Sequence, residues 1–344
     1  MRIILLQICK WLGGFAIARR ITSGGLRILC YHGISIKDEH LFRPSMFITP
    51  DLFRQRIDFL RKSRYPVLRL DHAIELLAAG TLPPNATVIT FDDGWYSSLI
   101  AASELRRYGL PATFYVASYY VKKQEPLFNL FVAYAIWQSG HTSLLWEGRE
   151  QEQPEITKNS SELGSAGRIE VMKQVARLTG VDYDEIAQSR RFGLMNEQEL
   201  RQLVADGFDI ELHTHRHTTP SDDMLLHREI ADNRAVLEQL VGRPVMHFCY
   251  PSGRYHASTI EVLKSERIES ATTVMAGLNF PGADHYLLRR TLDSITISQI
   301  EFEAEMSGFL DLVRFLTRRS TGFRPTTLLQ RSRRAQRYSP EPNS

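Results

Sequence analysis

The sequence predicts an α/β fold built on a parallel sheet or barrel. Short apolar runs rich in β-branched and aromatic residues alternate along the chain with segments of helical periodicity, a pattern typical of parallel sheets. Polar side chains come directly after several of these runs, and in a barrel of parallel strands such positions meet at the carboxyl-terminal rim. The chain has 344 residues, of which 43% are hydrophobic and 24% charged, so it suffices for one barrel-sized domain with additions.

The first part of the chain is expected to hold two strands and two helices. Residues 26–31 are an apolar run that ends at His32, and we predict the first strand there. Residues 51–64 carry apolar side chains at helical spacing, and a second, shorter helix over 71–79 ends at a glycine. The next predicted strand, over 86–91, leads into a pair of aspartates.

The middle of the chain is expected to interrupt the alternation of strands and helices. A helix over 97–108 and a strand over 111–116 continue the pattern, which then lapses between about residues 121 and 192. Within this segment, residues 127–138 predict an aromatic-rich helix, followed by a polar stretch as far as Gly167. We interpret the segment as an insertion, which can be a lid, a substrate-facing subdomain or a surface excursion without a role.

The alternation resumes after the insertion. A helix over 196–205 begins at Asn196, with Glu199 placed as in a capping box, and a strand over 207–212 follows. The remaining predicted elements are helices at 227–240 and 258–266 and strands at 245–250, 270–274 and 287–292.

Residues 1–25 predict an amphipathic helix outside the barrel domain. Its basic residues allow peripheral contact with a membrane surface through residues 1–20, although packing against the domain explains the pattern equally well. Gln7 and Lys10 interrupt the apolar stretch, which is shorter than the roughly 20 residues of a membrane span and lacks a clear signal-peptide cleavage site. We therefore expect a protein that is cytoplasmic or peripheral to the inner membrane.

The carboxyl-terminal end predicts a helix over 301–322 and then a basic, disordered tail over 323–344. The net charge is only +3, and a good part of the excess lies in that tail, so nucleic-acid binding has little support. The three cysteines, Cys9, Cys30 and Cys249, show no spacing pattern, so we expect buried free thiols rather than a disulfide framework.

Two clusters of polar residues predict a metal site. Asp92 and Asp93 follow the strand expected at 86–91, and because adjacent carboxylates repel, one is held ionised most easily by a cation, which leaves the other free to act as a base. An Asp-Gly pair after a strand is also a common turn signal. The run His213-Thr214-His215-Arg216-His217 follows another predicted strand; three histidines can form a polar loop, but together with the aspartates they favour metal binding.

Three motifs make the chain resemble a known family. The runs Thr90-Phe91-Asp92-Asp93-Gly94 and His213-Thr214-His215-Arg216-His217 resemble the first two motifs of the polysaccharide deacetylases, also called the NodB-homology family or family 4 carbohydrate esterases. The run Phe248-Cys249-Tyr250-Pro251-Ser252-Gly253 resembles the Tyr-Pro-x-Gly variant of that family's third motif. The resemblance spans about residues 27–296 and implies a NodB-like domain over 26–300, a deformed (β/α) barrel with the helical insertion.

The resemblance implies a divalent metal held by Asp93, His213 and His217, with zinc as the expected ion. From spacing alone His215 stays open as a ligand, because residues 213 and 217 face the same way on a helix, whereas 213, 215 and 217 do so on a strand. The resemblance makes Asp92 the base that takes a proton from water at the metal during attack on an acetamide carbonyl.

The third motif is expected to contact the substrate. The backbone N–H of Ser252 is the candidate oxyanion donor, because Pro251 has no N–H. Tyr250 is expected to line the sugar pocket, with a plain core or rim tyrosine as the alternative.

The chain departs from the family pattern at two positions. Cys249 stands where many members have an arginine that orients the base, so Arg254, Arg289 or Arg290 is expected to substitute, and we take Arg290 as the candidate. The family's late Leu-x-His, which supplies the acid, is missing, and His32 at the end of the first strand is the candidate for that role or for substrate contact.

The expected function is metal-dependent removal of N-acetyl groups from the amino sugars of a polysaccharide or glycolipid, with an N-acetylated saccharide as partner. Two alternatives stay open. One is a catalytically impaired carbohydrate-binding relative, which the missing acid and Cys249 would explain. The other is a non-haem iron enzyme that uses two histidines and one carboxylate, which is disfavoured because the second aspartate has no evident task in it.

Overall fold

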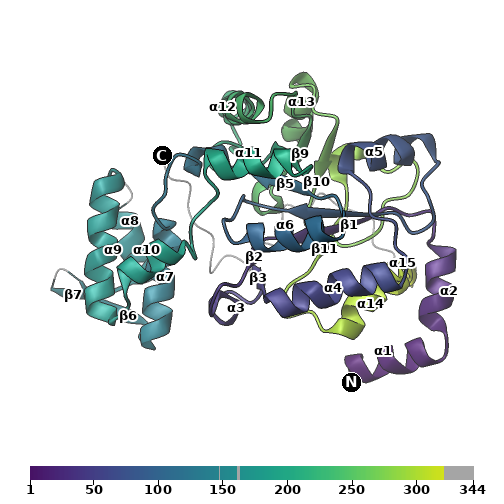
Figure 1. The fold of residues 1–344 in the computed structure, drawn as a ribbon, viewed down its shortest axis with the longest axis horizontal. Coiled ribbons are helices and arrows are strands. Elements are labelled where there is room, and N and C mark those ends of the chain that lie inside the picture. The colour runs from purple at the N-terminus through teal and green to yellow at the C-terminus, as the bar shows by residue number, and fades with distance from the viewer. Residues whose placement is uncertain (147, 161–162, 321–344) are drawn as a thin grey trace. The chain divides into compact units, whose positions relative to one another are not determined.

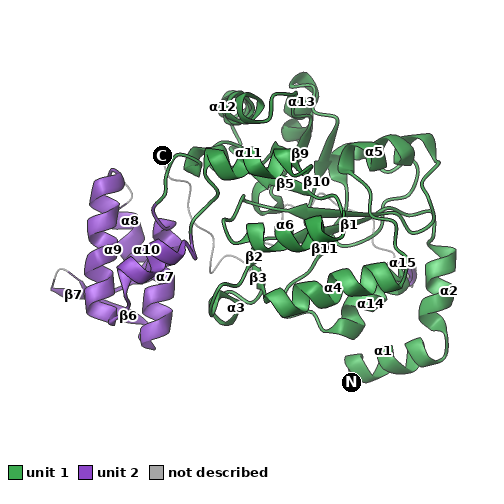
Figure 2. Cartoon of the chain, in the orientation of Figure 1, with its two compact units in different colours: residues 1–124, 193–311 green, residues 125–192, 312–344 purple. Residues whose placement is uncertain are grey.

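The computed structural model describes residues 1–146, 148–160 and 163–320, and it divides into two compact units (Figures 1 and 2). Unit 1 comprises Met1–Gln124 and Gly193–Asp311, and unit 2 comprises Glu125–Phe192 and Leu312–Ser344. The basic tail expected over 323–344 lies outside the described residues.

Unit 1 is built on a sheet of seven strands, in which every neighbouring pair is parallel (Figure 1). The spatial order is β10-β9-β8-β5-β4-β1-β11. Each strand falls within a range predicted from the sequence, so the predicted α/β class and its parallel strands are confirmed. The strands are β1 Arg27–Tyr31, β4 Thr87–Phe91, β5 Thr113–Val116, β8 Asp209–Leu212, β9 His247–Cys249, β10 Ser270–Thr272 and β11 Thr291–Leu292.

The sheet curls until one chain segment touches both of its edges. Thr291 of β11 pairs with Leu29 of β1, while Leu288, three residues earlier, pairs with Thr272 of β10. The N–H of Leu288 donates to Ala271, 3.0 Å away. The curled sheet is therefore a deformed barrel that residues 288–292 bring close to closure, as expected for the fold that the sequence resembles.

Both faces of the sheet are apolar, as in parallel sheets that are covered on each side. On one face, Leu29 and Tyr31 of β1 pack with Phe53 and Ile57 of helix α4 in the main core. The alternate residues face into the curl, where Ile28 belongs to a separate cluster that also holds Val88, Tyr115, Cys249 and Leu288. The helices predicted between the strands are present: α4 Pro50–Lys62, α5 Leu70–Ala79, α6 Ser98–Arg107, α11 Glu197–Ala205, α12 Asp223–Val241 and α13 Ala257–Ser265.

Short elements complete unit 1. Helix α11 starts with the capping box predicted from Asn196 and Glu199. The connections between the strands contain β2 Gly33–Ile34, α3 Glu39–Phe42, β3 Phe47–Ile48 and the 3₁₀ turns η1 Ser118–Tyr120, η2 Pro251–Gly253 and η3 His285–Leu287.

Each end of the described chain holds two helices where we expected one. Helices α1 Arg2–Trp11 and α2 Gly14–Ile21 are separated at Gly13, whose φ is 80°. Helices α14 Gln299–Met306 and α15 Phe309–Ser320 are separated at Gly308, whose φ is 74° and where a Cβ would come within 2.2 Å of Thr22 Oγ1. Within the described residues, no helix is both long and apolar enough to cross a membrane.

Unit 2 has a core of its own. Its helices are α7 Phe128–Ser139, α8 Gln153–Asn159, α9 Ser165–Thr179 and α10 Tyr183–Ser189, and β6 Ser143–Trp146 pairs with β7 Arg149–Glu152 as an antiparallel hairpin. The hairpin and α8 lie in the stretch for which the sequence indicated no regular structure, because burial of Trp146 and Ile156 organises it although its local pattern is weak. Arg191 is buried and donates to the hydroxyl of Tyr134 and the carboxylate of Glu185, at 3.0 and 2.9 Å.

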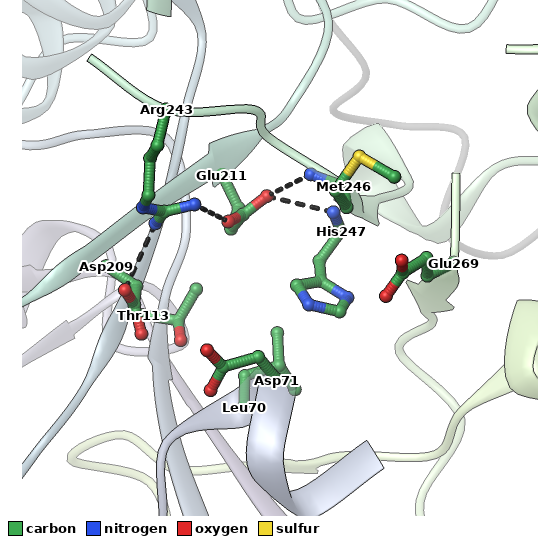
Figure 3. Close-up of a pocket in the computed structure, with 9 residues that line it drawn as sticks. All are labelled: Leu70, Asp71, Thr113, Asp209, Glu211, Arg243, Met246, His247 and Glu269. Atoms are coloured by element: carbon green, nitrogen blue, oxygen red, sulfur yellow. Dashed lines mark hydrogen bonds and ion pairs between the residues drawn. The ribbon is translucent and has the colours of Figure 1, made fainter. Parts of the chain in front are cut away.

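A cavity of about 140 Å³ lies at the amino ends of the strands (Figure 3). Glu211 accepts hydrogen bonds there from the backbone N–H groups of Met246 and His247, both at 2.8 Å, and from Arg243 at 3.0 Å. The His247 imidazole points into the cavity beside these groups. The residues that line it are Leu70, Asp71, Thr113, Asp209, Glu211, Arg243, Met246, His247 and Glu269.

Two groups of this cavity should give unfolding free energy opposite pH dependences. Burial raises the pKa of Glu211 to about 7, so the folded state holds a proton that the unfolded chain releases near pH 4.5, and this contribution to stability is lost as pH rises towards 7. Burial lowers the pKa of His247 to about 4, so the unfolded chain binds the extra proton, and stability rises with pH between about 4 and 6.5.

We therefore expect the two slopes largely to cancel in the wild type between pH 4.5 and 6.5. Glu211→Gln should leave stability that rises with pH in this window, and His247→Gln stability that falls, each by at most about 3 kcal/mol. Urea unfolding at a series of pH values measures both slopes. Parallel pH profiles for the two variants would contradict the assignment.

Candidate metal centre and active site

The two aspartates after β4 turn in different directions. The N–H of Asp92 continues the sheet ladder by donating to the carbonyl of Tyr31 at 2.9 Å. Asp93 then has φ 73° and Gly94 φ 87°, left-handed conformations that bend the chain sharply. A Cβ on Gly94 would lie 3.1 Å from Val116 Cγ1, so glycine suits both the turn and the close packing.

Asp93 meets two histidines. The Nε2 atoms of His213 and His217 both lie 3.1 Å from Asp93 Oδ1, and the ligand atoms of the three residues lie within 4.8 Å of one another. Trp95 Nε1 donates to the other oxygen of Asp93 at 2.8 Å. Two imidazoles and one carboxylate converging in this way fit a divalent transition metal and leave further coordination positions for water or substrate.

The rest of the structure orients His213 for this role. Its Nδ1 lies 2.8 Å from the carbonyl of Cys249, to which it donates, so Nε2 is the nitrogen that faces Asp93. Its backbone N–H donates to Asn233 Oδ1 at 2.9 Å, and Asn233 in turn donates to the carbonyl of Val116 at 3.0 Å. Helix α12 thus fixes the loop that carries the histidine.

The same loop contains strained backbone. Thr214 and His217 both have φ 58°, and the Thr214 hydroxyl accepts from the N–H of Thr218 at 3.0 Å. Together with Asp93 and Ser252, they are four of the eight non-glycine residues with positive φ among the described residues. Left-handed conformations of this kind cost of order 1–3 kcal/mol each and collect at functional sites, where the surrounding structure enforces them.

His215, which spacing alone left open as a ligand, is engaged elsewhere. Its Nδ1 lies 2.9 Å from Ser118 Oγ, and its ring meets the edge of Tyr119 with the ring centroids 5.5 Å apart. The group formed by His213, His217 and Asp93 does not include it.

Asp92 is paired with Arg290. The two terminal nitrogens of the guanidinium donate to the two carboxylate oxygens, both at 2.7 Å, and Nε donates to the carbonyl of Thr273 at 2.9 Å. Burial by itself would raise the pKa of Asp92, but the charge and hydrogen bonds of Arg290 outweigh it, so the pKa lies well below the usual range. Asp92 is therefore ionised throughout the physiological pH range.

Two thiols border the same carboxylate. The Sγ atoms of Cys30 and Cys249 each lie 3.4 Å from Asp92 Oδ2, and Arg290 Nη2 lies 3.1 Å from Cys249 Sγ. Burial raises the pKa of the Cys30 thiol, so it stays protonated and can donate a weak hydrogen bond. Cys249 holds the position of the family's third-motif arginine, and the guanidinium of Arg290 lies directly beside it.

His32 follows β1 at the edge of this group. Its Nε2 lies 4.0 Å from Asp92 Oδ2, and its side chain is 21% exposed. An imidazole near Asp92 and partly open to solvent is placed where it could exchange protons with a substrate or with water.

The third motif forms the tight turn η2. The N–H of Gly253 donates to the carbonyl of Tyr250 at 2.8 Å, and that of Arg254 to the carbonyl of Pro251 at 3.1 Å. Ser252, with φ 54°, is exposed, and within the described chain its N–H makes no hydrogen bond. That N–H is the donor of this turn that stays available for a substrate oxygen.

Tyr250 lies in the core rather than at a sugar pocket. Its side chain is 1% exposed, its hydroxyl donates to the carbonyl of Tyr286 at 2.9 Å, and its ring packs against Tyr255. The sugar contact that we predicted for Tyr250 is therefore corrected to a packing role. The alternation of the strand explains it, since Tyr250 shares a face with Phe248 in the main core.

The sequence analysis missed two residues that support the site. Trp95, which holds Asp93, stands only two positions after it, so its place in the first motif was an available signal. Asn233, which holds the backbone of His213, lies within α12, where a single buried asparagine gives no local indication of its partner.

Comparison with known proteins agrees with this arrangement. Residues 79–270 match the family model described as polysaccharide deacetylase, and the chain belongs to that family. Membership implies an acetylated polysaccharide as substrate and a metal-dependent reaction, for which Asp93, His213 and His217 are the candidate ligands. No curated protein sequence matches the chain significantly.

Solved structures share the fold. The Streptococcus pyogenes deacetylase PplD is 17% identical with a TM-score of 0.57, over 82% of this chain and 98% of the other. IcaB from Ammonifex degensii is 21% identical with a TM-score of 0.56, over 82% and 97% of the two chains. The de-N-acetylase from Aggregatibacter actinomycetemcomitans is 14% identical with a TM-score of 0.55, over 82% and 99%. At these identities the likeness shows the fold alone.

The three convergent ligands predict one tightly bound divalent ion. After removal of metal with a chelator, the wild type should bind one equivalent of zinc, measured by calorimetry and elemental analysis. His213→Ala, His217→Ala and Asp93→Asn should each weaken binding by more than about 100-fold, and Trp95→Phe by about 10- to 100-fold, because it only orients a ligand.

His215→Gln is the matched control for the metal-binding variants. It removes an imidazole from the same five-residue motif, and we expect its zinc affinity to equal that of the wild type. Loss of zinc binding in His215→Gln, with binding retained in His217→Ala, would show that the ligand set is wrong.

Proposed function

We propose that this protein is a metal-dependent hydrolase that removes N-acetyl groups from the amino sugars of a polysaccharide or glycolipid. The observation that carries the proposal is that two neighbouring carboxylates have different partners. Asp93 meets His213 and His217 at 3.1 Å, while Asp92 is held by Arg290 at 2.7 Å, directly beside them. One side of the pair can hold a metal ion and the other can accept a proton.

Asp92 is the base in this proposal. A divalent metal would lower the pKa of its water ligand and polarise the acetamide carbonyl. The carboxylate of Asp92 accepts the proton that the attacking water loses. Because Arg290 lowers the pKa of Asp92, this carboxylate is ionised at the working pH but is a weak base. A weak base suffices where a metal lowers the pKa of the attacking water.

The remaining groups serve the oxygen and the leaving amine. The free N–H of Ser252 donates to the oxygen that becomes negative in the tetrahedral state. His32, with Nε2 4.0 Å from Asp92 and part of its ring open to solvent, protonates the amine nitrogen as the C–N bond breaks. The products are acetate and a free amino sugar.

Asp92→Asn should abolish deacetylation without loss of the metal. The amide cannot accept the proton, so we expect acetate release from N-acetylglucosamine oligomers to fall by about 10²- to 10⁴-fold. The assay uses the purified protein, stripped of metal and reloaded with zinc or cobalt, and includes His215→Gln as a variant that keeps activity.

The outcomes separate the alternatives. Metal-dependent release that disappears in Asp92→Asn supports the proposal and the base together. If the wild type binds one metal but releases no acetate from glucosamine oligomers, lipid-linked saccharides or O-acetylated saccharides, the protein is a carbohydrate-binding relative without this activity.

Arg290→Gln should shift the pH profile of kcat/KM. Removal of the guanidinium leaves the burial that raises the pKa of Asp92, so the acid limb should move to higher pH, with a loss of about 100-fold or more in kcat at its optimum. Arg290→Lys keeps the positive charge but loses the paired hydrogen bonds. Its kcat and the pH of its acid limb should therefore lie between those of the wild type and those of Arg290→Gln.

Arg289→Gln is the control for Arg290, since it removes the neighbouring arginine. Thermal melting of each variant checks folding, because loss of one partner of a buried pair costs about 3–5 kcal/mol. An acid limb at the same pH in wild type and Arg290→Gln would remove Arg290 from the proposed mechanism.

A further inference from the structure

The first two helices expose an apolar surface that the rest of unit 1 does not cover. We call it the N-terminal apolar face. Trp11 is its most exposed member, at 85%. Its residues are Ile4, Leu5, Ile8, Trp11 and Leu12 in and just after α1, and Ile17 and Ile21 of α2.

The helices use a different side for packing. Leu6, Phe15 and Ala304 of α14 form a small buried cluster, with Cys9 partly buried against it. Residues 4, 8 and 11 follow one another at helical spacing and share one side of α1, with residues 5 and 12 alongside, whereas residues 6 and 9 point to another. Internal packing therefore does not account for the N-terminal apolar face.

The charges around the face are positive. Residues 1–37 contain no aspartate or glutamate. Arg2 and Lys10 pair with Glu301 and Glu303 of α14. Arg20 is exposed, lies one turn after Ile17 on α2, and forms no ion pair within the part of the chain that the structure describes. Arg19 turns towards the rest of unit 1, where it donates to the carbonyl of Ser63 at 2.6 Å and lies over the Tyr65 ring, 4.1 Å from its centroid.

An apolar stripe with tryptophan at its edge and an exposed arginine, Arg20, beside it matches the boundary of a lipid bilayer, where acyl chains lie below anionic phosphates. Helices of 10 and 8 residues are too short to cross a bilayer, so they would lie along its surface. A protein partner would fit the apolar residues, but the positive charge favours an anionic surface.

We propose that α1 and α2 dock this protein on an anionic lipid bilayer, with the N-terminal apolar face among the acyl chains and Arg20 at the phosphates. Because α2 precedes the amino end of β1, docking through it leaves the carboxyl ends of the strands, where Asp92 and His213 lie, free for substrate (Figure 1). The docking is independent of the proposed deacetylation.

The test is co-sedimentation of the metal-loaded full chain with vesicles. We expect binding to phosphatidylcholine vesicles that contain phosphatidylglycerol, binding at least about tenfold weaker to phosphatidylcholine alone, and loss of binding at high salt. Tryptophan emission should shift to the blue on binding, and Trp11→Phe should remove the shift: Trp95 and Trp146 are already buried, and Trp137, which is 41% exposed, belongs to α7 rather than to the N-terminal apolar face.

Two variants and two controls make the test specific. Ile8→Ser with Trp11→Ser should weaken binding at least about tenfold, and so should Arg20→Glu. Met224→Ser and Arg228→Glu change exposed residues of α12 in the same way and should bind as the wild type does. If the wild type releases acetate from soluble oligomers, all four proteins should do so at the wild-type rate.

Three results would overturn the proposal. They are absence of binding to anionic vesicles, equal binding by wild type and the Ile8→Ser, Trp11→Ser variant, and a wild type that forms dimers which this variant converts to monomers. The last would show that the face is covered by a second copy of the chain.

Discussion

The ion pair between Asp92 and Arg290 is the interaction on which both the barrel and the site depend. Burying two charges costs several kcal/mol each, and that cost is repaid only when geometry is good and the remaining hydrogen-bonding groups are satisfied. Here the pair is bidentate, and the guanidinium also donates to Thr273 and Thr90, at 2.9 and 3.2 Å. Because Arg290 lies in the segment that bridges β10 and β1, the same contact joins the two edges of the sheet to the first motif.

The pair also explains how two adjacent aspartates coexist. The positive φ at Asp93 directs its carboxylate to the histidines, while Asp92 turns into the curl of the sheet towards Arg290. Hydrogen bonds and opposite charges lower the pKa of both, although burial opposes ionisation of each. The two carboxylates can have different partners because the backbone at Asp93 adopts this strained conformation.

The sequence predicted the strands well because each one is an apolar run followed by a polar turn. It also placed Asp92, Asp93, His213 and His217 at one end of the sheet, since parallel strands bring their carboxyl ends together. The assignment of side chains to faces was weaker. Period-two alternation puts Tyr250 with Phe248 in the main core, and applying it would have prevented the sugar-pocket prediction for Tyr250.

Long-range partners were beyond local patterns. Three arginines were open as substitutes for the missing one, and only the curl of the sheet decides which reaches Asp92. Leu288 and Arg290 are two residues apart in the closing segment, and Leu288 belongs to the cluster inside the curl that also holds Cys249, which places the guanidinium on the same side. The packing of the β6–β7 hairpin, with its buried Trp146, was hidden for the same reason.

The position of the arginine shows that such a site is defined in space rather than along the chain. The family pattern expects a guanidinium from β9, at the position of Cys249, whereas here it comes from the segment leading into β11. In an open, flat sheet four strands, β8, β5, β4 and β1, would separate β9 from β11. The curl brings both within reach of the carboxylate that ends β4, as the 3.4 Å from Cys249 Sγ and the 2.7 Å from Arg290 to Asp92 show. Because Cys249 stands at the first position, the guanidinium of Arg290 contacts its thiol instead of a second cation, so Asp92 still faces one positive charge.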